Sequence, residues 1–282
     1  MQIVRSISEM QRESRSWRLK GRTIGFVPTM GALHDGHASL IRAARRETDQ
    51  VVVSIFINPI QFNDQRDYRT YPRDLSRDRR LVMASGASLL FVPNAAAFYP
   101  DRHVTYVTVE RLTERLCGRS RPGHFRGVTT VVAKLLHCVQ PDRLYLGQKD
   151  AQQAVVLRRM VVDLSWPVVV RVLPTIREAE GLAMSSRNAL LTPQQRCEAV
   201  AIAESLRMAQ GAVRSGEQRA AILRRLIRRR LEREPSIRVD YVEVVDVETL
   251  APLARVTGRA FIAVAAWVGA IRLIDNVIVR IV

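Results

Sequence analysis

The sequence contains little lysine, few cysteines and few aromatic residues, and it has no long hydrophobic run. Its three cysteines, Cys117, Cys138 and Cys197, lie far apart without a C-x-x-C pair, so neither a disulfide framework nor a zinc ribbon is expected. The longest nearly pure apolar stretch, residues 261–268, is far shorter than the ~20 residues that span a bilayer. The N-terminal segment has no apolar block followed by a small-residue cleavage site, which argues against a secretory signal. We therefore expect a cytoplasmic protein without a membrane partner.

Charge is the unusual feature of the composition. Lys and Arg total 44 against 27 Asp and Glu, a formal net charge of +17, and all but three of the cations are Arg. Such an excess is typical of nucleic-acid-binding proteins. However, the arginines are spread from Arg5 to Arg280, and only 6% of the residues are aromatic. The densest cluster, 224–234, is interleaved with apolar residues at helical spacing, which predicts an amphipathic helix with an Arg-rich solvated side. We expect no nucleic-acid partner, and a basic nucleic-acid-binding protein is the least favoured alternative.

The first part of the chain alternates short apolar runs with helical patterns. With 282 residues, 47% of them hydrophobic, the chain is long enough to bury a sizeable core. The expected strands are 23–28, 51–57, 88–92, 143–146 and 167–173, and the expected helices are 37–48, 74–85, 125–139 and 150–162. This alternation of Val/Ile/Leu runs and amphipathic helices predicts an α/β domain at 1–174, with a parallel sheet that is covered on both faces.

The pattern changes after Pro174. Thr192, followed by Pro193 and then by Gln195, has the spacing of a helix start with a capping box. Two long helices are expected at 193–213 and 217–233, followed by strands near 238–245, 260–268 and 277–282. This order predicts a separate, smaller α+β domain at 175–282.

Residues 25–45 contain the first candidate site. An apolar strand ends at Pro28, a glycine-containing turn follows, and a helix is expected to start at about Gly36. His34 and His37 lie at the N-terminus of this helix, where free backbone N–H groups and the helix dipole favour an anion such as phosphate. The alternatives are that the histidines only cap the helix or form half of a metal site, which would need further ligands. Neither G-x-x-x-x-G-K-[ST] nor G-x-G-x-x-G is present.

Three further segments offer polar groups for a ligand. Residues 184–188 combine two hydroxyls with an Arg, which suit a triphosphate. Residues 147–150 follow a predicted strand and place Lys149 and Asp150 at the carboxyl edge of the sheet, where open α/β folds bind ligands. Asn58, Gln61 and Tyr71 follow another strand and offer neutral hydrogen-bonding groups for a small hydroxylated ligand.

Six sequence runs, in this order, closely resemble the pantothenate synthetase (pantoate–β-alanine ligase) family. They are PTMGALHDGH, NPIQF, YPRD, GHFRGVTTVVAKLL, GQKDAQQ and PTIREAEGLAMSSRN, and the resemblance extends to RLIDN at 272–276. Single motifs of this kind occur across the nucleotidyltransferase superfamily with its HIGH and KMSKS signatures, so another enzyme of that superfamily is the alternative function. The resemblance implies a Rossmann-like, doubly wound ATP- and pantoate-binding domain at 1–174, a smaller lid domain at 175–282, and a homodimer.

The resemblance also implies the reaction. An ATP-dependent ligation would join pantoate and β-alanine to pantothenate through a pantoyl-adenylate intermediate, releasing AMP and pyrophosphate, with Mg²⁺ accompanying ATP. No protein nucleophile is required, so positioning and charge stabilisation would supply the catalysis.

The family resemblance assigns residues to roles. Catalysis would fall to His34, His37, Lys149 and Arg187, and no metal ligand is assigned. Pantoate would contact Gln61 and Gln153, and β-alanine would contact Gln61. The ATP site would comprise Met30, Gly31, Ala32, Leu33, His34, Asp35, Gly36, His37, Gly147, Gln148, Lys149, Asp150, Ile176, Met184, Ser185, Ser186 and Arg187.

The family pattern makes His37 a proton donor, but a carboxylate attacks without giving up a proton, so stabilisation of the departing pyrophosphate is the better-motivated role. The family commonly has Glu where this chain has Gln148, beside Lys149. We expect this change to have little effect if the side chain points away from ATP.

Overall fold

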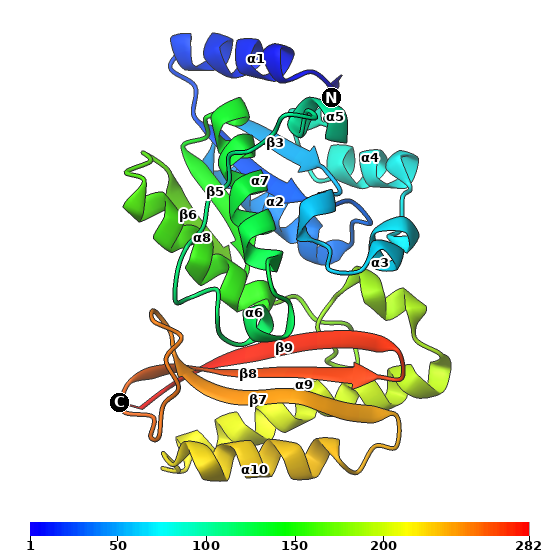
Figure 1. Ribbon diagram of the computed structural model, residues 1–282, viewed down its shortest axis with the longest axis vertical. Helices are drawn as coiled ribbons and strands as arrows, with labels where there is room; N and C mark the ends of the chain where they lie inside the picture. The colour runs from blue at the N-terminus through cyan, green and yellow to red at the C-terminus, as the bar shows by residue number, and fades with distance from the viewer. Residues whose placement is uncertain (282) are drawn as a thin grey trace. The chain divides into compact units, whose positions relative to one another are not determined.

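The computed structural model describes residues 1–281, which form two compact units (Figure 1). The first unit comprises Met1–Glu114, Gly118–Gly147 and Val156–Pro174. The second comprises Arg115–Cys117, Gln148–Val155 and Thr175–Val282. Each unit has its own sheet.

The first unit is built on a six-stranded, fully parallel sheet. Its strands, in spatial order, are β1 (Gln2–Val4), β4 (Leu89–Phe91), β3 (Gln50–Ile55), β2 (Ile24–Thr29), β5 (Arg143–Gly147) and β6 (Val169–Leu173). The predicted α/β class and parallel sheet are therefore confirmed. β1 was not predicted, because a three-residue strand is too short to show a pattern in the sequence.

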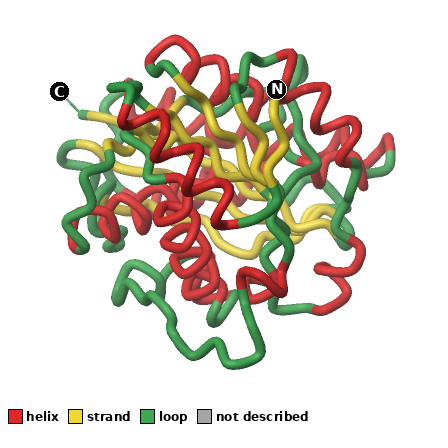
Figure 2. Tube along the Cα trace, turned by 90° about the horizontal axis from the view of Figure 1, so that it is seen from above, coloured by secondary structure: helices red, strands yellow, loops and turns green. Residues whose placement is uncertain are grey.

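Helices cover both faces of this sheet, which explains its continuous apolar strands (Figure 2). On β3, Val51 and Val53 are buried in a cluster with residues of α2 (Asp35–Glu47). Val52, between them, faces the other way and is equally buried. α7 (His124–Val139) contacts β2, and α1 (Ile7–Leu19) contacts α7.

The remaining helices between residues 59 and 163 are mostly short. In chain order they are η1 (Pro59–Gln61), α3 (Gln65–Thr70), α4 (Leu75–Ala84), α5 (Ala95–Phe98), α6 (Cys117–Ser120), η2 (Gln148–Asp150) and α8 (Ala151–Asp163). Within residues 1–281, no helix combines the length and the apolar character that crossing a membrane requires.

The second unit packs helices against an antiparallel sheet. Strands β7 (Ile237–Asp246), β8 (Arg259–Val268) and β9 (Ile271–Arg280) pair in that order, and α9 (Pro193–Arg214) and α10 (Ala220–Leu231) contact them (Figure 1). β9 begins six residues before the strand expected at 277–282. Its first half contains polar residues that the apolar pattern missed, and these are ion-paired: Arg272 with Asp240 at 2.7 Å and Asp275 with Arg177 at 2.6 Å.

α10 is the amphipathic helix predicted from the Arg-rich cluster. Leu223, Ile227 and Leu231 are fully buried on one side of it. Arg230 on the same helix forms ion pairs with Glu204 and Glu234, both at 2.6 Å. Part of the positive charge is thus balanced within the unit instead of being presented to a polyanion.

Gly127 allows α7 to approach the η1 turn closely. A Cβ atom at this position would lie 2.6 Å from the carbonyl oxygen of Ile60 and 2.7 Å from the Cα of Gln61. Both neighbours are backbone atoms, which cannot move aside as a flexible side chain could. The glycine therefore sets the distance between the helix and this turn.

Gly127→Ala is expected to destabilise the fold by roughly 1–3 kcal/mol, because overpacking would displace backbone. Gly211 in α9 provides the matched control: a Cβ there meets no atom within 4 Å, so Gly211→Ala should stabilise by up to ~1 kcal/mol through helix propensity. Urea unfolding of both variants measures the two free energies. Equal stability of Gly127→Ala and wild type would show that the close approach imposes no constraint.

Candidate functional site

The strand order of the first unit reverses between β2 and β5. β3 and β4 follow β2 on one side, whereas β5 and β6 lie on the other. In open α/β sheets, ligands bind beyond the carboxyl ends of the strands at such a switch point. β2 leads directly into Met30–His37, and β5 ends at Gly147.

A buried carboxylate shapes the loop after β2. Gly31 and Ala32 both adopt left-handed backbone, with φ of 84° and 50°. Asp78 of α4, only 2% exposed, accepts hydrogen bonds from the N–H groups of Ala32 (3.0 Å) and Leu33 (2.8 Å). Burial raises the pKa of Asp78, and these two hydrogen bonds oppose the rise. Because both amides are already bonded, Ala32 and Leu33 shape the predicted ATP loop and do not offer it N–H donors.

The two predicted histidines form the N-terminal cap of α2. His34 is the N-cap residue, and its Nδ1 accepts from the N–H of Gly36 at 3.2 Å. The Nδ1 of His37 accepts from the N–H of His34 at 3.3 Å, which completes a reciprocal capping box. The two ring centroids lie 4.2 Å apart.

This cap decides which atoms of the histidines serve as donors. Since each Nδ1 accepts a hydrogen bond, each neutral imidazole carries its proton on Nε2. The N–H of His37 is also used, because it donates to the carbonyl oxygen of His34 at 2.8 Å. The expectation of free helix amides is therefore wrong for residues 34, 36 and 37. Each ring is thus held to the helix cap by its Nδ1 atom.

Gln61, the predicted pantoate and β-alanine contact, is held within a buried network. It ends η1 and is 8% exposed. Its Oε1 accepts from the Nδ2 of Asn58 at 2.9 Å, and its Nε2 donates to the Sδ of Met30 at 2.9 Å. The structure thus brings Met30 and Gln61, two predicted site residues far apart in the sequence, into direct contact.

Asn58 determines which end of the Gln61 amide is available. The Nδ2 of Asn58 also donates to the carbonyl oxygen of Gly127 at 3.0 Å, an acceptor that fixes the orientation of the Asn58 amide. The hydroxyl of Tyr99 donates to the Oδ1 of Asn58 at 2.8 Å, and burial raises the pKa of Tyr99, so that hydroxyl keeps its proton. Gln61 therefore presents an NH₂ group, which suits an acceptor oxygen of a ligand.

The second unit contains the remaining predicted residues except Gly147, which ends β5 in the first unit. Lys149 lies in η2, and its Nζ is 3.7 Å from the Oδ1 of Asp150. The Nε2 of Gln148 donates to the Oδ1 of Asn276 at 3.4 Å. The side chain of Gln148 is thus engaged with β9 through a donor group, and the expectation that Gln in place of Glu has little effect stays a prediction.

Two adjacent glutamines of α8 have different tasks. Gln152 is buried, and its side chain bonds to the backbone of Arg115 (2.7 Å) and Cys117 (2.9 Å). Gln153, the predicted pantoate contact, is half-buried. The engagement of Gln152 leaves Gln153 as the better candidate for a ligand.

The loop at 176–187 is stabilised from inside the second unit. The N–H of Met184 donates to the carbonyl oxygen of Ile176 at 3.0 Å. Ser185 caps the short helix η3 (Ser186–Leu190) by accepting from the N–H of Arg187 at 3.2 Å. Ser185 therefore has a structural role as a helix cap. Its predicted contact with triphosphate would use a hydroxyl group that already accepts this hydrogen bond.

Sequence reasoning missed the residues that hold these loops. Asp78 and Asn276 bond to backbone 46 and 127 residues away in the chain. Asn276 belongs to the RLIDN motif, whereas Asp78 lies four residues after YPRD and outside every motif, and neither stretch of sequence indicates which distant backbone its residue contacts. Only the tertiary structure provides this information.

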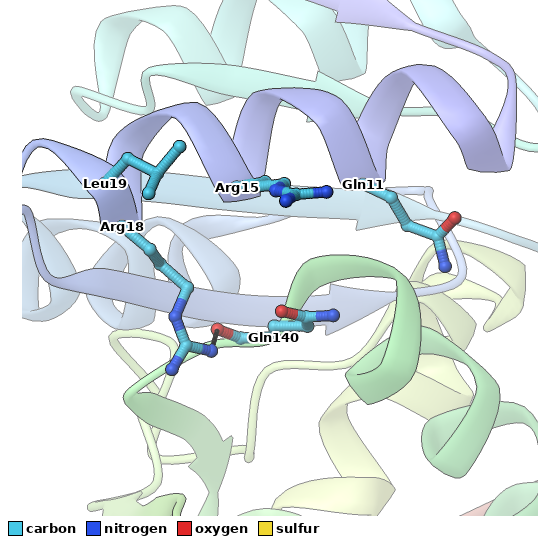
Figure 3. Close-up of a pocket in the computed structure, with 5 residues that line it drawn as sticks. All are labelled: Gln11, Arg15, Arg18, Leu19 and Gln140. Carbon is cyan, nitrogen blue, oxygen red and sulfur yellow. Dashed lines mark hydrogen bonds between the residues drawn. The ribbon is translucent and has the colours of Figure 1, made fainter.

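A cavity of about 500 Å³ lies elsewhere on the first unit (Figure 3). Gln11, Arg15, Arg18 and Leu19 of α1 line it together with Gln140, and none of the five is buried. None of them is a predicted site residue. Arg18 donates to the carbonyl oxygen of Gln140 at 3.4 Å, a weak contact across an open surface.

Comparison with known proteins identifies the family. Residues 2–278 match the family described as pantoate-beta-alanine ligase. Pantothenate synthetase of Moorella thermoacetica is 50% identical over 281 residues, covering 100% of this chain and 99% of that protein. The enzyme of Thermotoga neapolitana is 51% identical over 278 residues, covering 99% of both.

Solved structures agree with the sequence comparison. Pantothenate synthetase from Thermus thermophilus matches with a TM-score of 0.93 at 44% identity, covering 98% of this chain and 99% of that one. Pantoate-beta-alanine ligase from Francisella tularensis, complexed with beta-gamma ATP and beta-alanine, matches with a TM-score of 0.81 at 37% identity over 98% and 97%. The chain therefore belongs to the pantoate–β-alanine ligase family.

Proposed function

We propose that the protein joins pantoate and β-alanine to pantothenate at the expense of ATP, through a pantoyl-adenylate intermediate. The observation that carries this proposal is the full-length match to the Francisella enzyme, which was complexed with a nucleotide and β-alanine. The chain keeps the polar residues of the family motifs, from His34 and His37 to Arg187.

The first step needs charge stabilisation and no protein nucleophile. A carboxylate oxygen of pantoate bonds to the α-phosphorus of ATP, and the bond to the β-phosphate oxygen breaks, its electron pair leaving with pyrophosphate. The Nε2–H groups of His34 and His37 would donate to phosphate oxygens as negative charge moves onto the leaving group. Lys149 would add a compact positive charge, and Arg187 a planar fork of donors.

Gln61 would orient pantoate. Its Oε1 is engaged by Asn58 and one hydrogen of its NH₂ group by the Sδ of Met30, so the second hydrogen would donate to a carboxylate or hydroxyl oxygen of the substrate. Gln153 would provide the second contact. Asp150 would bind the ribose, Ile176 the adenine through its backbone, and residues 184–187 the triphosphate.

The second step forms the amide. The amine nitrogen of β-alanine, held by Gln61, bonds to the carbonyl carbon of the adenylate. The carbon–oxygen bond to AMP breaks, its electron pair leaves with AMP, and the amine releases a proton to solvent. Positioning is the main contribution of the protein here, because both reactants are already reactive.

We propose that ATP enters as its magnesium complex. Residues 1–281 contain no group of three or more His, Cys, Asp or Glu side chains arranged to hold a metal ion. This fits Mg²⁺ bound mainly by phosphate oxygens and water, as is usual for nucleotide substrates. No residue is assigned to the metal.

Four further proposals rest on the family resemblance. They are a homodimer, a cytoplasmic location, ATP and pantoate binding by residues 1–174, and a lid formed by residues 175–282. The shielded thiols of Cys117 and Cys138 are compatible with a reducing compartment.

AMP release tests the proposed function. Purified protein should sustain AMP release from ATP only when pantoate and β-alanine are both supplied. Pantothenate should then form in an amount equal to the AMP released. No AMP under any condition, despite ATP binding, would contradict the proposal.

His34→Asn separates catalysis from helix capping. Asn is among the best N-cap residues, so α2 should keep its cap and the protein its stability. The Asn side chain is shorter and its NH₂ group does not reach the position of the imidazole Nε2, so turnover should fall by about 10²-fold. His137→Asn on α7 is the control, because His137 bonds to the Ala133 carbonyl and is no site residue. Wild-type turnover in His34→Asn would remove this histidine from the mechanism.

A further inference from the structure

The motif RLIDN at 272–276 ends in a buried asparagine that donates hydrogen bonds to the backbone of η2, the element that contains Lys149. Asn276 of β9 is 3% exposed. Its Nδ2 donates to the carbonyl oxygens of Gln148 and Lys149, each at 2.9 Å. Its Oδ1 accepts from the Nε2 of Gln148 at 3.4 Å. The NH₂ group of this side-chain amide is thus directed at two consecutive carbonyls of η2.

This geometry requires an amide at position 276. Two carbonyl oxygens that converge on one point need two donors from a single small group, which a neutral NH₂ supplies. Aspartate has a similar shape but no donor, and it would place negative charge against both oxygens. β9 pairs along its length with β8, and Asn276 lies opposite Ala263, so the amide projects from a fixed strand.

The residue before Asn276 in β9 holds a second loop through an ion pair. Asp275, also 3% exposed, accepts from Arg177 at 2.6 and 3.1 Å. Arg177 in turn donates to the carbonyl oxygen of Gly181 at 3.1 Å and forms a β-bridge with Ala183. These contacts brace the loop that leads into Met184–Arg187.

We infer that Asn276 is a positioning residue that holds Lys149 in place for the nucleotide phosphates, with Asp275 bracing the adjacent loop from the same strand. Neither side chain touches the substrate in this account. Asn276 acts through the backbone of η2, which determines where the Lys149 ammonium can reach. The inference rests on the proposed function for the identity of the nucleotide.

Asn276→Asp tests the inference directly. The KM for ATP should rise roughly tenfold or more, because two buried carbonyls lose their donors, whereas the KM for pantoate should stay within about twofold of wild type. Asn94→Asp is the matched control: the Asn94 side chain serves as a cap acceptor for Ala97, which aspartate does equally well. If Asn276→Asp does not fold, the KM for ATP is measured in Asn276→Ser instead. The Ser hydroxyl keeps one neutral donor.

A double-mutant cycle distinguishes positioning from general stability. In a Lys149→Ala background, Asn276→Asp should raise the KM for ATP no further, since the residue through which it acts is absent. Independent, multiplying effects would overturn the inference, as would a wild-type KM for ATP in Asn276→Asp.

Direct titration with Mg·ATP keeps this test separate from the proposed function. If wild-type protein makes no pantothenate, the proposed function fails, and the effect of Asn276→Asp on nucleotide affinity still decides the inference. Equal affinity in wild type and Asn276→Asp would contradict it.

Discussion

The candidate site depends on one constraint: irregular backbone at the ends of strands must find hydrogen-bond partners inside the protein. Buried side chains satisfy this constraint for N–H groups in one segment and for carbonyl groups in another. Asp78 accepts from two consecutive N–H groups in the loop after β2. Asn276 donates to two consecutive carbonyls in η2. Each arrangement fixes a short segment that follows a strand by hydrogen bonds from a distant side chain.

This scaffolding suits a reaction that needs no covalent chemistry from the protein. In the proposed reaction, adenylate formation and amide formation would proceed between reactive substrates, so the protein would have to align them and to stabilise moving charge. Preorganised donors do this well, because they need no rearrangement during the reaction. The capping box at α2 is an example, since it holds both imidazoles by their Nδ1 atoms.

The sequence predicted the architecture where apolar patterns were strong. The buried runs of β2 and β3, the capping box of α9 and the apolar face of α10 all lie where they were expected. The first half of β9 was missed, because its charged residues are tolerated only through ion pairs with distant partners. α1 was missed as well: Met10 and Ser14 are its buried positions, too few for a periodic signal.

The candidate site was predictable as a set of residue types but not as an arrangement. The motifs pointed to His34, His37, Gln61 and Lys149, whereas the tautomers and amide orientations emerged from backbone contacts. Which end of Gln61 faces a ligand depends on Gly127, 66 positions later, through Asn58. Such relations arise only when the chain is folded.

Pyrophosphate exchange tests the central claim, activation of pantoate by adenylation, most directly. Labelled pyrophosphate should enter ATP when pantoate and Mg²⁺ are present and β-alanine is omitted, because the first step is reversible and needs no amine. Exchange that requires β-alanine, or pantothenate formation with no exchange under these conditions, would contradict a separate adenylate and with it the roles assigned to His34, His37 and Lys149.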